Sequence, residues 1–324
     1  MQDYLQELTQ TKGYLTYAEF VQEAVYHPEF GYYTADRNRV GKTPDSDFYT
    51  SMSLGTTFGK LVWESVQKLM GQRELAEYTF VEIAAEPETS VLIDLDHCFA
   101  DHQIIRLGDP LLLSSDKCVV FSNEWLDAQP FHRLVFRQGK WRELGVKIGE
   151  DSLEEIELEV PSEEVQPWLV RLPEQYYEDY HFDVPSGAEL ILDEIMQQNW
   201  TGLFLTLDYG KSLQELLEIT PQGTARAYYR HHQSNDLLKQ PGQQDLTCHL
   251  CWDWLETTMA KHSFDEISTI RQESLFMRYA TSAIQQILEN PEYPQETGRI
   301  KELLHPSHMG HRFQALYGIR TKKH

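Results

Sequence analysis

Two carboxylates and an amide follow an apolar segment in the stretch KCVVFSNEWLDAQP, which begins at Lys117. Asn123 and Glu124 come directly after the apolar run, and Asp127 follows three residues later. Ligands of open α/β sheets bind at the carboxyl ends of the strands, so these polar groups are candidates for a site. Carboxylates in such a place pair with cationic groups through charge-assisted hydrogen bonds. The alternative is that Asn123 or Asp127 only caps the following turn.

Further candidate residues lie elsewhere in the chain. Glu82 and Asp208 belong to two other apolar runs. The stretch GTARAYYRHH carries two arginines, two tyrosines and two histidines, but by itself it is typical of a solvated loop. The stretch PGQQDLTCHL supplies Asp245, Thr247 and His249 around an expected helix start, where Asp245 or Thr247 could instead be the N-cap.

Neither of two motifs with metal-ligand residue types predicts a metal site. CHLC, at residues 248–251, is a single CxxC motif, and a zinc site would need a second pair of ligands. The other two cysteines, Cys98 and Cys118, are each isolated, which also excludes a disulfide framework and suits a reducing compartment. HPSHMGH contains three histidines, but its proline and glycine oppose a rigid helical face. We therefore expect no metal.

The net charge of the chain limits the classes of partner that it can bind. The 324 residues carry a formal net charge of -23. A surface this acidic repels phosphate backbones and anionic membrane surfaces, so we expect neither a nucleic-acid partner nor a membrane partner. A small basic or neutral substrate, or a protein with a basic segment, is compatible with it. No signal peptide and no apolar run of about 20 residues is found, so we expect a cytoplasmic protein.

Short apolar runs indicate the strands of a parallel sheet covered on both faces. They are FVEI, HQIIRL, KCVVFSNEW and GLFLTLDYG. A helical pattern at 187–198 predicts a βαβ unit between two of them. The stretch FVEIAAEPETSVL, at residues 80–92, predicts a strand, a turn and then a helix.

Other segments complete the predicted α/β fold. Thr16–Tyr26 and Thr56–Met70 have helical periodicity, and Thr16 with Glu19 predicts a capping box at the start of the first helix. HRLVFRQGKWREL alternates and turns at Gln138–Gly139, which predicts a hairpin inserted between the third and fourth strands. HRFQALYGIR predicts a last edge strand. The expected architecture is an α/β sheet with a helical N-terminal arm and an insertion.

The order of the motifs is more specific than any one of them. Along almost the whole sequence we find, in this order, AVYHPEFGYYT, DFYTSMSLGTTFG, VEI, NEWLDAQP, LTLDYG, GTARAYYRHH, PGQQDLTCH and HMGHRFQAL. This succession resembles the MidA family of class I methyltransferases, which includes a mitochondrial complex I assembly factor that methylates protein arginine. The resemblance implies a Rossmann-like class I fold that binds S-adenosylmethionine (SAM) and carries an inserted subdomain.

The resemblance also implies a domain division and site residues. Residues 1–75 would be a helical arm that contributes to the substrate pocket. Residues 76–324 would be the methyltransferase domain, with an insertion at about 131–185 and an excursion at about 211–246. Implied catalytic residues are Asn123, Glu124 and Asp127, where a carboxylate orients an arginine guanidinium. Implied substrate-binding residues are Asp47, Tyr49, Thr50, Arg226, Tyr228, Asp245 and His249, and implied cofactor-binding residues are Glu82, Ala84, Asp109 and Asn123.

The loop after the first strand departs from the family pattern. The family has glycines at three positions that fall on Ala84, Glu86 and Glu88, where glycine lets the backbone approach the cofactor at positive φ. Pro87 fixes φ and removes a donor. The acid that ends the family's second strand and binds the ribose is missing, and the nearest acid is Asp109. The interval between the first and third strands is short, so we expect a helix to be trimmed there.

Two functions therefore compete. In the first, the chain is a SAM-dependent methyltransferase that acts on a protein arginine side chain with an altered cofactor loop. In the second, it is a catalytically inactive pseudo-methyltransferase whose retained pocket binds a protein or assists its assembly. Turnover of SAM with a basic protein substrate would separate the two.

Overall fold

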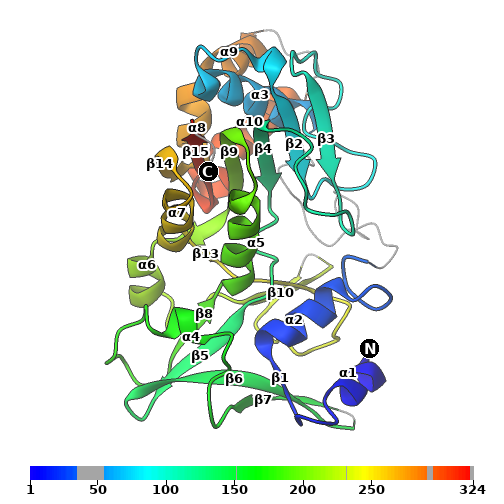
Figure 1. The fold of residues 1–324 in the computed structure, drawn as a ribbon, viewed down its shortest axis with the longest axis vertical. Coiled ribbons are helices and arrows are strands. Elements are labelled where there is room, and N and C mark those ends of the chain that lie inside the picture. Colours follow the sequence, from blue (N-terminus) through cyan, green and yellow to red (C-terminus); the bar gives the residue numbers. More distant parts are fainter. Residues whose placement is uncertain (35–54, 151, 231, 290–294, 322–324) are drawn as a thin grey trace. The chain divides into compact units, whose positions relative to one another are not determined.

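The structure, a computed structural model, describes residues 1–34, 55–150, 152–230, 232–289 and 295–321 (Figure 1). The chain divides into two units. Unit 1 comprises Met1–Phe48, Leu126–Ile191 and Lys211–Cys251, and unit 2 comprises Tyr49–Trp125, Leu192–Gly210 and Trp252–His324. The boundary between the units falls inside helix α5 (Ser186–Gln197). The presence of this helix confirms the helical pattern predicted at 187–198. No helix of the described residues is long and apolar enough to cross a membrane.

A mixed sheet forms the centre of unit 2, with the strand order β14–β15–β9–β4–β2–β3. Strands β3, β2, β4 and β9 are parallel to one another, which confirms the four predicted strands, whereas β15 and β14 run antiparallel to their neighbours. The bounds are β2 (Thr79–Ile83), β3 (Asp101–Ile105), β4 (Lys117–Asn123), β9 (Thr201–Lys211), β14 (Phe264–Arg271) and β15 (Phe313–Arg320).

Strand β15 lies inside the sheet, so its prediction as an edge strand was wrong. It pairs with β9 on one side and β14 on the other, and nearly all of its side chains are buried. Burial of successive residues is typical of an interior strand covered on both faces. The edge position belongs to β14, whose side chains are more exposed.

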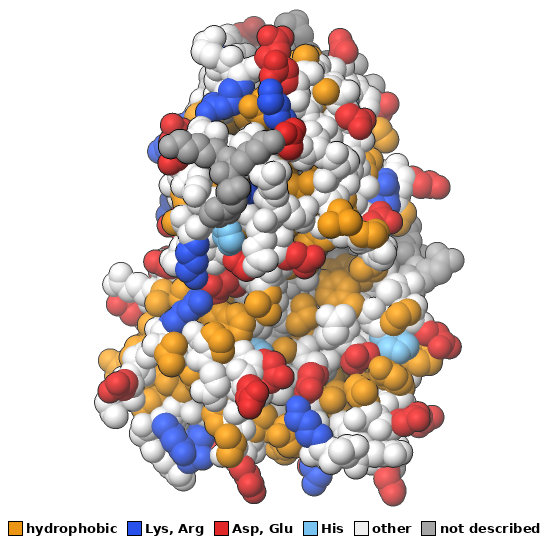
Figure 2. All heavy atoms as spheres, in the orientation of Figure 1, with side chains coloured by type: hydrophobic (Ala, Val, Ile, Leu, Met, Phe, Trp, Pro, Cys, Tyr) orange, Lys and Arg blue, Asp and Glu red, His pale blue; other side chains and the backbone are white. Residues whose placement is uncertain are grey.

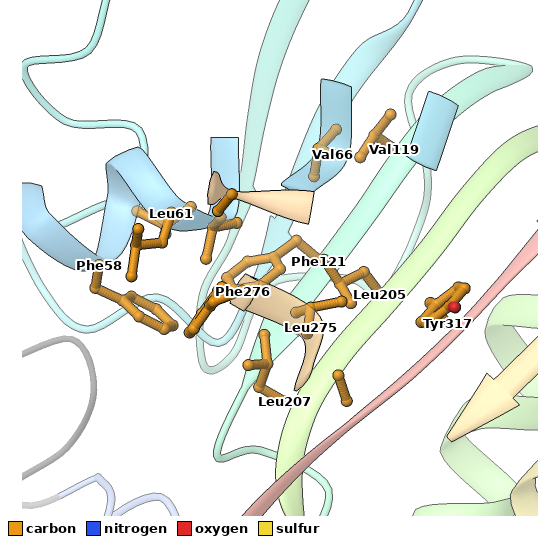
Figure 3. Packing of buried hydrophobic residues seen from close by; sticks show 14 of the residues in the cluster. Phe58, Leu61, Val66, Val119, Phe121, Leu205, Leu207, Leu275, Phe276 and Tyr317 are labelled. Carbon is orange, nitrogen blue, oxygen red and sulfur yellow. The ribbon is translucent and has the colours of Figure 1, made fainter. Parts of the chain in front are cut away.

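Helices pack an apolar cluster against one face of this sheet. Phe58 and Leu61 of α3 (Thr56–Met70) lie near Phe121 of β4 and Leu205 of β9 (Figure 3). Each fully buried side chain of this size contributes about 1.5–3 kcal/mol. Helix α3 ends before Gly71, as predicted. The other helices of unit 2 are α7 (Trp252–Lys261), α8 (Gln272–Tyr279), α9 (Thr281–Glu289), α10 (Glu296–Leu304) and the short helices η2 (Leu75–Glu77) and η3 (Pro306–Gly310).

The connection from β2 to β3 contains turns and no helix, which corrects the helix predicted after the first strand. Glu88 and Asp94 have φ angles of 60° and 62°, and such left-handed residues interrupt an α-helix. Pro87 also lacks the backbone donor that a helix interior requires. The connection from β3 to β4 has no helix either. Residues 84–116 thus form no helix, and the expected trimming relative to the family stays a prediction.

Unit 1 contains an antiparallel sheet with the order β1–β6–β5–β8, and β7 pairs with β6. The predicted hairpin is confirmed, because Gln138 and Gly139 join β5 to β6 with φ angles of 51° and 73°. The capping box of α2 (Tyr17–Tyr26) is also confirmed. The remaining bounds are α1 (Gln2–Leu8), β1 (Leu15–Thr16), β5 (His132–Arg137), β6 (Lys140–Ile148), β7 (Leu153–Glu157), α4 (Gln166–Leu169), β8 (Tyr180–Val184) and α6 (Leu213–Glu218).

A small sheet in unit 1 corrects two further predictions. The stretch GTARAYYRHH, expected as a loop, forms β10 (Arg226–Tyr229) and β11 (His232–Ser234), and the helix start expected near Asp245 is strand β12 (Asp245–Thr247). Ala227 of β10 lies opposite Leu246 of β12, and both are buried. Burial of this facing pair favours strands over a solvated loop. After β13 (Leu250–Cys251), the next helix is α7.

Replacement of Gly223 by alanine should destabilise the protein by more than about 2 kcal/mol. Gly223 has a φ of 70°, and an added Cβ would overlap the carboxylate of Asp183. Gly139→Ala is the control, because Gly139 has a similar φ of 73° but open space around it. The control should cost only about 1 kcal/mol. Urea denaturation of both variants measures the difference, and equal losses would contradict the steric argument.

Candidate functional site

The carboxyl ends of four parallel strands of unit 2 lie in register. Ile83 of β2 is aligned with Ile105 of β3 and with Ser122 of β4, and Ser122 is aligned with Thr206 of β9. The residues that follow this row therefore share one edge of the sheet. They include Ala84, Arg106 and Asn123, and ligands of parallel sheets bind at such an edge. We call this edge the strand-end site.

A strained turn follows β4 at the strand-end site. Glu124 has a φ of 48°, a left-handed conformation that costs a non-glycine residue about 1–3 kcal/mol. Two hydrogen bonds hold it there: Glu124 N donates to Leu207 O (2.9 Å), and Trp125 N donates to Asp208 Oδ2 (3.1 Å). Asp208 is fully buried, and its Oδ1 accepts from Tyr209 N. The direction of Glu124 is therefore fixed by its neighbours in β9.

The amide of Asn123 presents an acceptor at this edge. Asn123 Nδ2 donates to Glu124 Oε1 (3.1 Å), whereas the buried Asn123 Oδ1 has no hydrogen-bond partner among the described residues. A buried acceptor in this state costs about 1–3 kcal/mol, which a ligand donor would recover. Asn123 Oδ1 and the Glu124 carboxylate together suit a ligand with N–H donors or positive charge.

The predicted cofactor-binding residues fall in different surroundings. Ala84 follows β2 with a φ of 61°, and Ala84 N donates to Ile105 O (2.8 Å). Glu82 is buried, and its carboxylate accepts from Ser90 and from Val91 N. Glu82 therefore lies beneath the loop that follows β2.

At the end of β3, Arg106 follows the strand, whereas the family pattern ends this strand with an acid. The guanidinium of Arg106 donates to Thr89 O (3.2 Å). Asp109 is exposed, and its carboxylate closes a turn by accepting from Arg106 N (2.8 Å). No carboxylate directly follows β3 in the described part of the chain, so the contact to a ribose would differ from that of the family pattern.

The remaining predicted residues that are described belong to unit 1. Asp127 and Asp245 are both buried, and Asp245 of β12 lies opposite Tyr228 of β10. Arg226 donates to the carbonyl of Ala225, within its own turn. The predicted residues Asp47, Tyr49 and Thr50 lie outside the described residues.

Tyr33 is influenced by the charges of both Asp127 and Asp245 in unit 1. Its pKa is raised well above the usual range, first by burial and then by negative charges that include Asp245 and Asp127. Both carboxylates are therefore near the hydroxyl of Tyr33. Tyr33 stacks on Tyr26, with ring centroids 5.6 Å apart. Sequence reasoning missed these two tyrosines, although both stand within the motif AVYHPEFGYYT.

His249 is held neutral in unit 1. Burial, followed by the positive charges of Lys211 and Arg226, lowers its pKa to about 4, and only the charge of Asp183 opposes this shift. His249 N donates to Thr224 Oγ1 (3.1 Å), which ties the motif PGQQDLTCH to the motif GTARAYYRHH. His249 Nδ1 is buried without a partner in the described structure.

Two other features do not coincide with the predicted residues. A cavity of about 730 Å³ in unit 2 is lined mainly by α3 and α9, and includes Trp63, Lys68 and Gln286, but none of the predicted site residues. Among the described residues, no group of three or more His, Cys, Asp or Glu is arranged to hold a metal ion.

Comparison with known proteins relates this geometry to methyltransferases. The family described as "Putative S-adenosyl-L-methionine-dependent methyltransferase" matches residues 73–268, which is more than half of the chain. The mitochondrial protein arginine methyltransferase NDUFAF7 of Danio rerio is 22% identical, over 96% of this chain and 85% of the relative. NDUFAF7 of Rattus norvegicus is also 22% identical, over 93% of this chain and 80% of the relative.

Solved structures confirm the predicted fold class. A crystal structure of a protein from Burkholderia thailandensis, described as a "likely methyl transferase" and bound to S-adenosyl-homocysteine, matches with a TM-score of 0.85 at 19% identity. The match covers 98% of this chain and 91% of that one. A second structure from the same organism matches with a TM-score of 0.81 at 18% identity, over 98% and 90%. The chain thus has the Rossmann-like class I methyltransferase fold.

Replacement of Ala84 by glycine should stabilise the protein by about 1 kcal/mol, because glycine adopts the left-handed conformation without steric cost. Ala85→Gly is the matched control, since Ala85 is not among the residues with positive φ. The control should lose about 0.4–1 kcal/mol through the greater entropy of the unfolded chain. The free energy of unfolding of each variant measures this, and stabilisation by both substitutions would contradict it.

The depressed pKa of His249 predicts a loss of stability in acid. The unfolded histidine titrates near 6.5, so between pH 6.5 and about 4 the unfolded state binds the extra proton. The contribution of His249 is thus complete above pH 6.5 and is lost as the pH falls toward 4. From pH 7 to pH 5 the loss is about 2 kcal/mol, which His249→Gln should remove.

Denaturant unfolding at pH 7 and pH 5 tests this pH dependence. His308→Gln serves as the control, because the side chain of His308 is exposed. The control should keep the pH dependence of the unchanged protein. An equal pH dependence in His249→Gln would show that His249 is not held neutral by the fold.

Proposed function

We infer that this chain, which belongs to the family of putative SAM-dependent methyltransferases, transfers a methyl group from SAM to a nitrogen atom of a protein arginine side chain. The observation that carries the proposal is the pair of acceptors at the end of β4, Asn123 Oδ1 and the Glu124 carboxylate. The curated relatives named as protein arginine methyltransferases support the choice of arginine.

Two features of the strand-end site, Asn123 Oδ1 and the backbone at Ala84, suit the binding of SAM. Asn123 Oδ1 is a buried acceptor that suits an N–H donor of the cofactor or substrate. Ala84 keeps a φ of 61°, so the backbone after β2 has the left-handed form that glycine favours at this family position. In contrast, Arg106 stands where the family has its ribose acid, and a guanidinium can donate to ribose oxygens but cannot accept from them.

We assign the positioning of the arginine nitrogen to Glu124. SAM, when bound, supplies an electrophilic methyl group on its sulfonium sulfur. The Glu124 carboxylate pairs with the guanidinium and fixes which nitrogen faces that methyl group, since methyl transfer depends mainly on alignment. The turn held by Asp208 keeps the carboxylate in place without reorganisation. We also assign to the Glu124 carboxylate the role of the base that takes the proton released by the methylated nitrogen.

Acidic groups elsewhere support a basic protein substrate. In unit 1, the buried acids Asp127 and Asp245 act on Tyr33, whose half-buried ring stacks on that of Tyr26. Such a group suits a cationic side chain, which gains from carboxylates and from aromatic faces. Figure 2 shows acidic side chains spread over the face in view, consistent with the net charge of -23. We propose that a basic segment of the substrate protein is attracted by this charge.

Glu124→Gln should reduce methylation of an arginine-rich protein such as protamine by about 100-fold or more, because the neutral amide neither pairs strongly with the guanidinium nor accepts its proton. The affinity for SAM should stay within about threefold of the unchanged protein, since Glu124 is assigned to the substrate. Transfer of radiolabelled methyl groups and calorimetric titration with SAM measure the two effects. Glu289→Gln, at an exposed position of α9, is the control.

The same measurements distinguish the pseudo-methyltransferase alternative. Full methylation by Glu124→Gln would refute the role of Glu124. Absence of SAM binding to the unchanged protein at millimolar concentration would refute the enzymatic proposal, and retention of a basic protein in that case would favour a binding or assembly function.

A further inference from the structure

We propose that Glu82 is a positioning residue that holds the loop after β2 in its cofactor-binding shape and does not itself touch the cofactor. We call the hydrogen bonds from Ser90 and Val91 to Glu82 the brace. The expected effect of the brace on SAM binding rests on the proposed function, but the brace itself is a property of the free protein. It assigns to a buried carboxylate the task that glycines perform at this place in the family pattern.

The carboxylate of Glu82 is fully engaged beneath the loop. Its side chain is 3% exposed, and Oε2 accepts a hydrogen bond of 2.6 Å from Ser90 Oγ. Both oxygens also accept from Val91 N, at 2.9 and 3.0 Å. Hydrogen bonds to a charged acceptor are stronger than those between neutral groups. Glu82 thus binds the far end of the loop that begins two residues after it.

Ser90 and His102 extend this brace. Ser90 Oγ accepts from Leu92 N (3.1 Å), so the same hydroxyl that donates to Glu82 also closes the next turn. His102 Nε2 of the neighbouring strand lies 3.5 Å from Ser90 Oγ and 3.6 Å from Glu82 Oε2. The network joins β2, the loop and β3 through buried Glu82 and Ser90 and half-buried His102.

Contacts at three further places fix the rest of the loop. Ala84 N donates to Ile105 O at its beginning, and the Arg106 guanidinium donates to Thr89 O in its second half. Helix α3 comes so close that a Cβ added at Gly59 would overlap Val91 O. The segment from Ala84 to Thr89 is therefore held by hydrogen bonds at both of its ends.

The brace explains how a loop without glycine keeps left-handed residues. Ala84 and Glu88 have φ angles of 61° and 60°, which are unfavourable for side chains other than glycine. Without an external constraint, both would relax toward negative φ. The hydrogen bonds of Glu82 supply that constraint, because release of the loop would leave the buried Val91 N–H and the Glu82 carboxylate without partners.

Two substitutions remove the bond between Glu82 and Ser90, one at the acceptor and one at the donor. Glu82→Met removes every acceptor while keeping the length of the side chain, and Ser90→Ala removes the hydroxyl but leaves Glu82 intact. Thr89→Ala is the matched control in the same loop, because its hydroxyl makes only an exposed bond to Glu86 O. Glu82→Gln retains one acceptor for Val91 N and should fall between Glu82→Met and the unchanged protein.

Hydrogen exchange and SAM titration of these variants test the proposal. Exchange of the Val91 amide should be at least about tenfold faster in Glu82→Met and in Ser90→Ala than in the unchanged protein or Thr89→Ala. The Kd for SAM should rise about tenfold or more in both brace variants. Because Glu82 and Ser90 share one contact, the Kd for SAM of the double variant should be little higher than that of the single variant that binds SAM more weakly.

Each outcome decides a different claim. If Ser90→Ala left SAM affinity and Val91 exchange unchanged while Glu82→Met abolished binding, Glu82 would be a direct ligand and the proposal would be overturned. If the unchanged protein did not bind SAM, the proposed function would fail, whereas the exchange rates would still test the brace. Equal Val91 exchange in all variants would overturn the brace even if SAM bound normally.

Discussion

The backbone N–H groups of turns that follow strands must find acceptors, and this chain satisfies them with buried carboxylates. In unit 2, Asp208 accepts from Trp125 N in the turn after β4, and Glu82 accepts from Val91 N in the loop after β2. In unit 1, Asp183 accepts from Thr224 N and Ala225 N. A turn lies outside the strand ladder, so a donor buried there without such an acceptor would cost about 1–3 kcal/mol.

These carboxylates shape the turns on which the function depends. The Asp208 bond sets the direction of Glu124, and the Asp183 bonds set the turn of the motif GTARAYYRHH, where Arg133 also pairs with Asp183 (2.8 Å). Left-handed conformations at non-glycine residues are then tolerated, because the surrounding bonds outweigh a local cost of about 1–3 kcal/mol. Two of the acids that are candidates for a site in the sequence, Glu82 and Asp208, therefore hold the backbone.

The rigid sheet of unit 2 makes such fixed turns useful. Apolar side chains of α3 and α8, such as Phe58 and Phe276, pack in one cluster with Leu207 of β9 (Figure 3). A site built on the ends of packed strands keeps its geometry better than one built on a free loop. The turn that carries Asn123 and Glu124 is consequently held in one geometry by its bonds to β9.

Much of this protein was determined by local sequence. The parallel strands, the capping box at Thr16, the hairpin at Gln138–Gly139 and the family order of motifs could all be predicted, because each depends on neighbours within a few residues or on a resemblance over the whole chain. The sequence also placed Asn123 and Glu124 at a strand end, which the structure confirms. Their roles in catalysis remain predictions.

Only the tertiary structure decided the pairings between distant segments. The place of β15 inside the sheet, the strands of the motif GTARAYYRHH and the bond from Trp125 N to Asp208 join residues that are far apart in sequence, and no local pattern encodes their partners. Packing also distinguishes Glu82 from Glu124, although both lie in or directly after apolar runs. Glu82 binds Ser90 and Val91 beneath a loop, whereas Glu124 does not bind these residues. Which partner a buried carboxylate meets is decided by packing, and that decides whether it can reach a ligand.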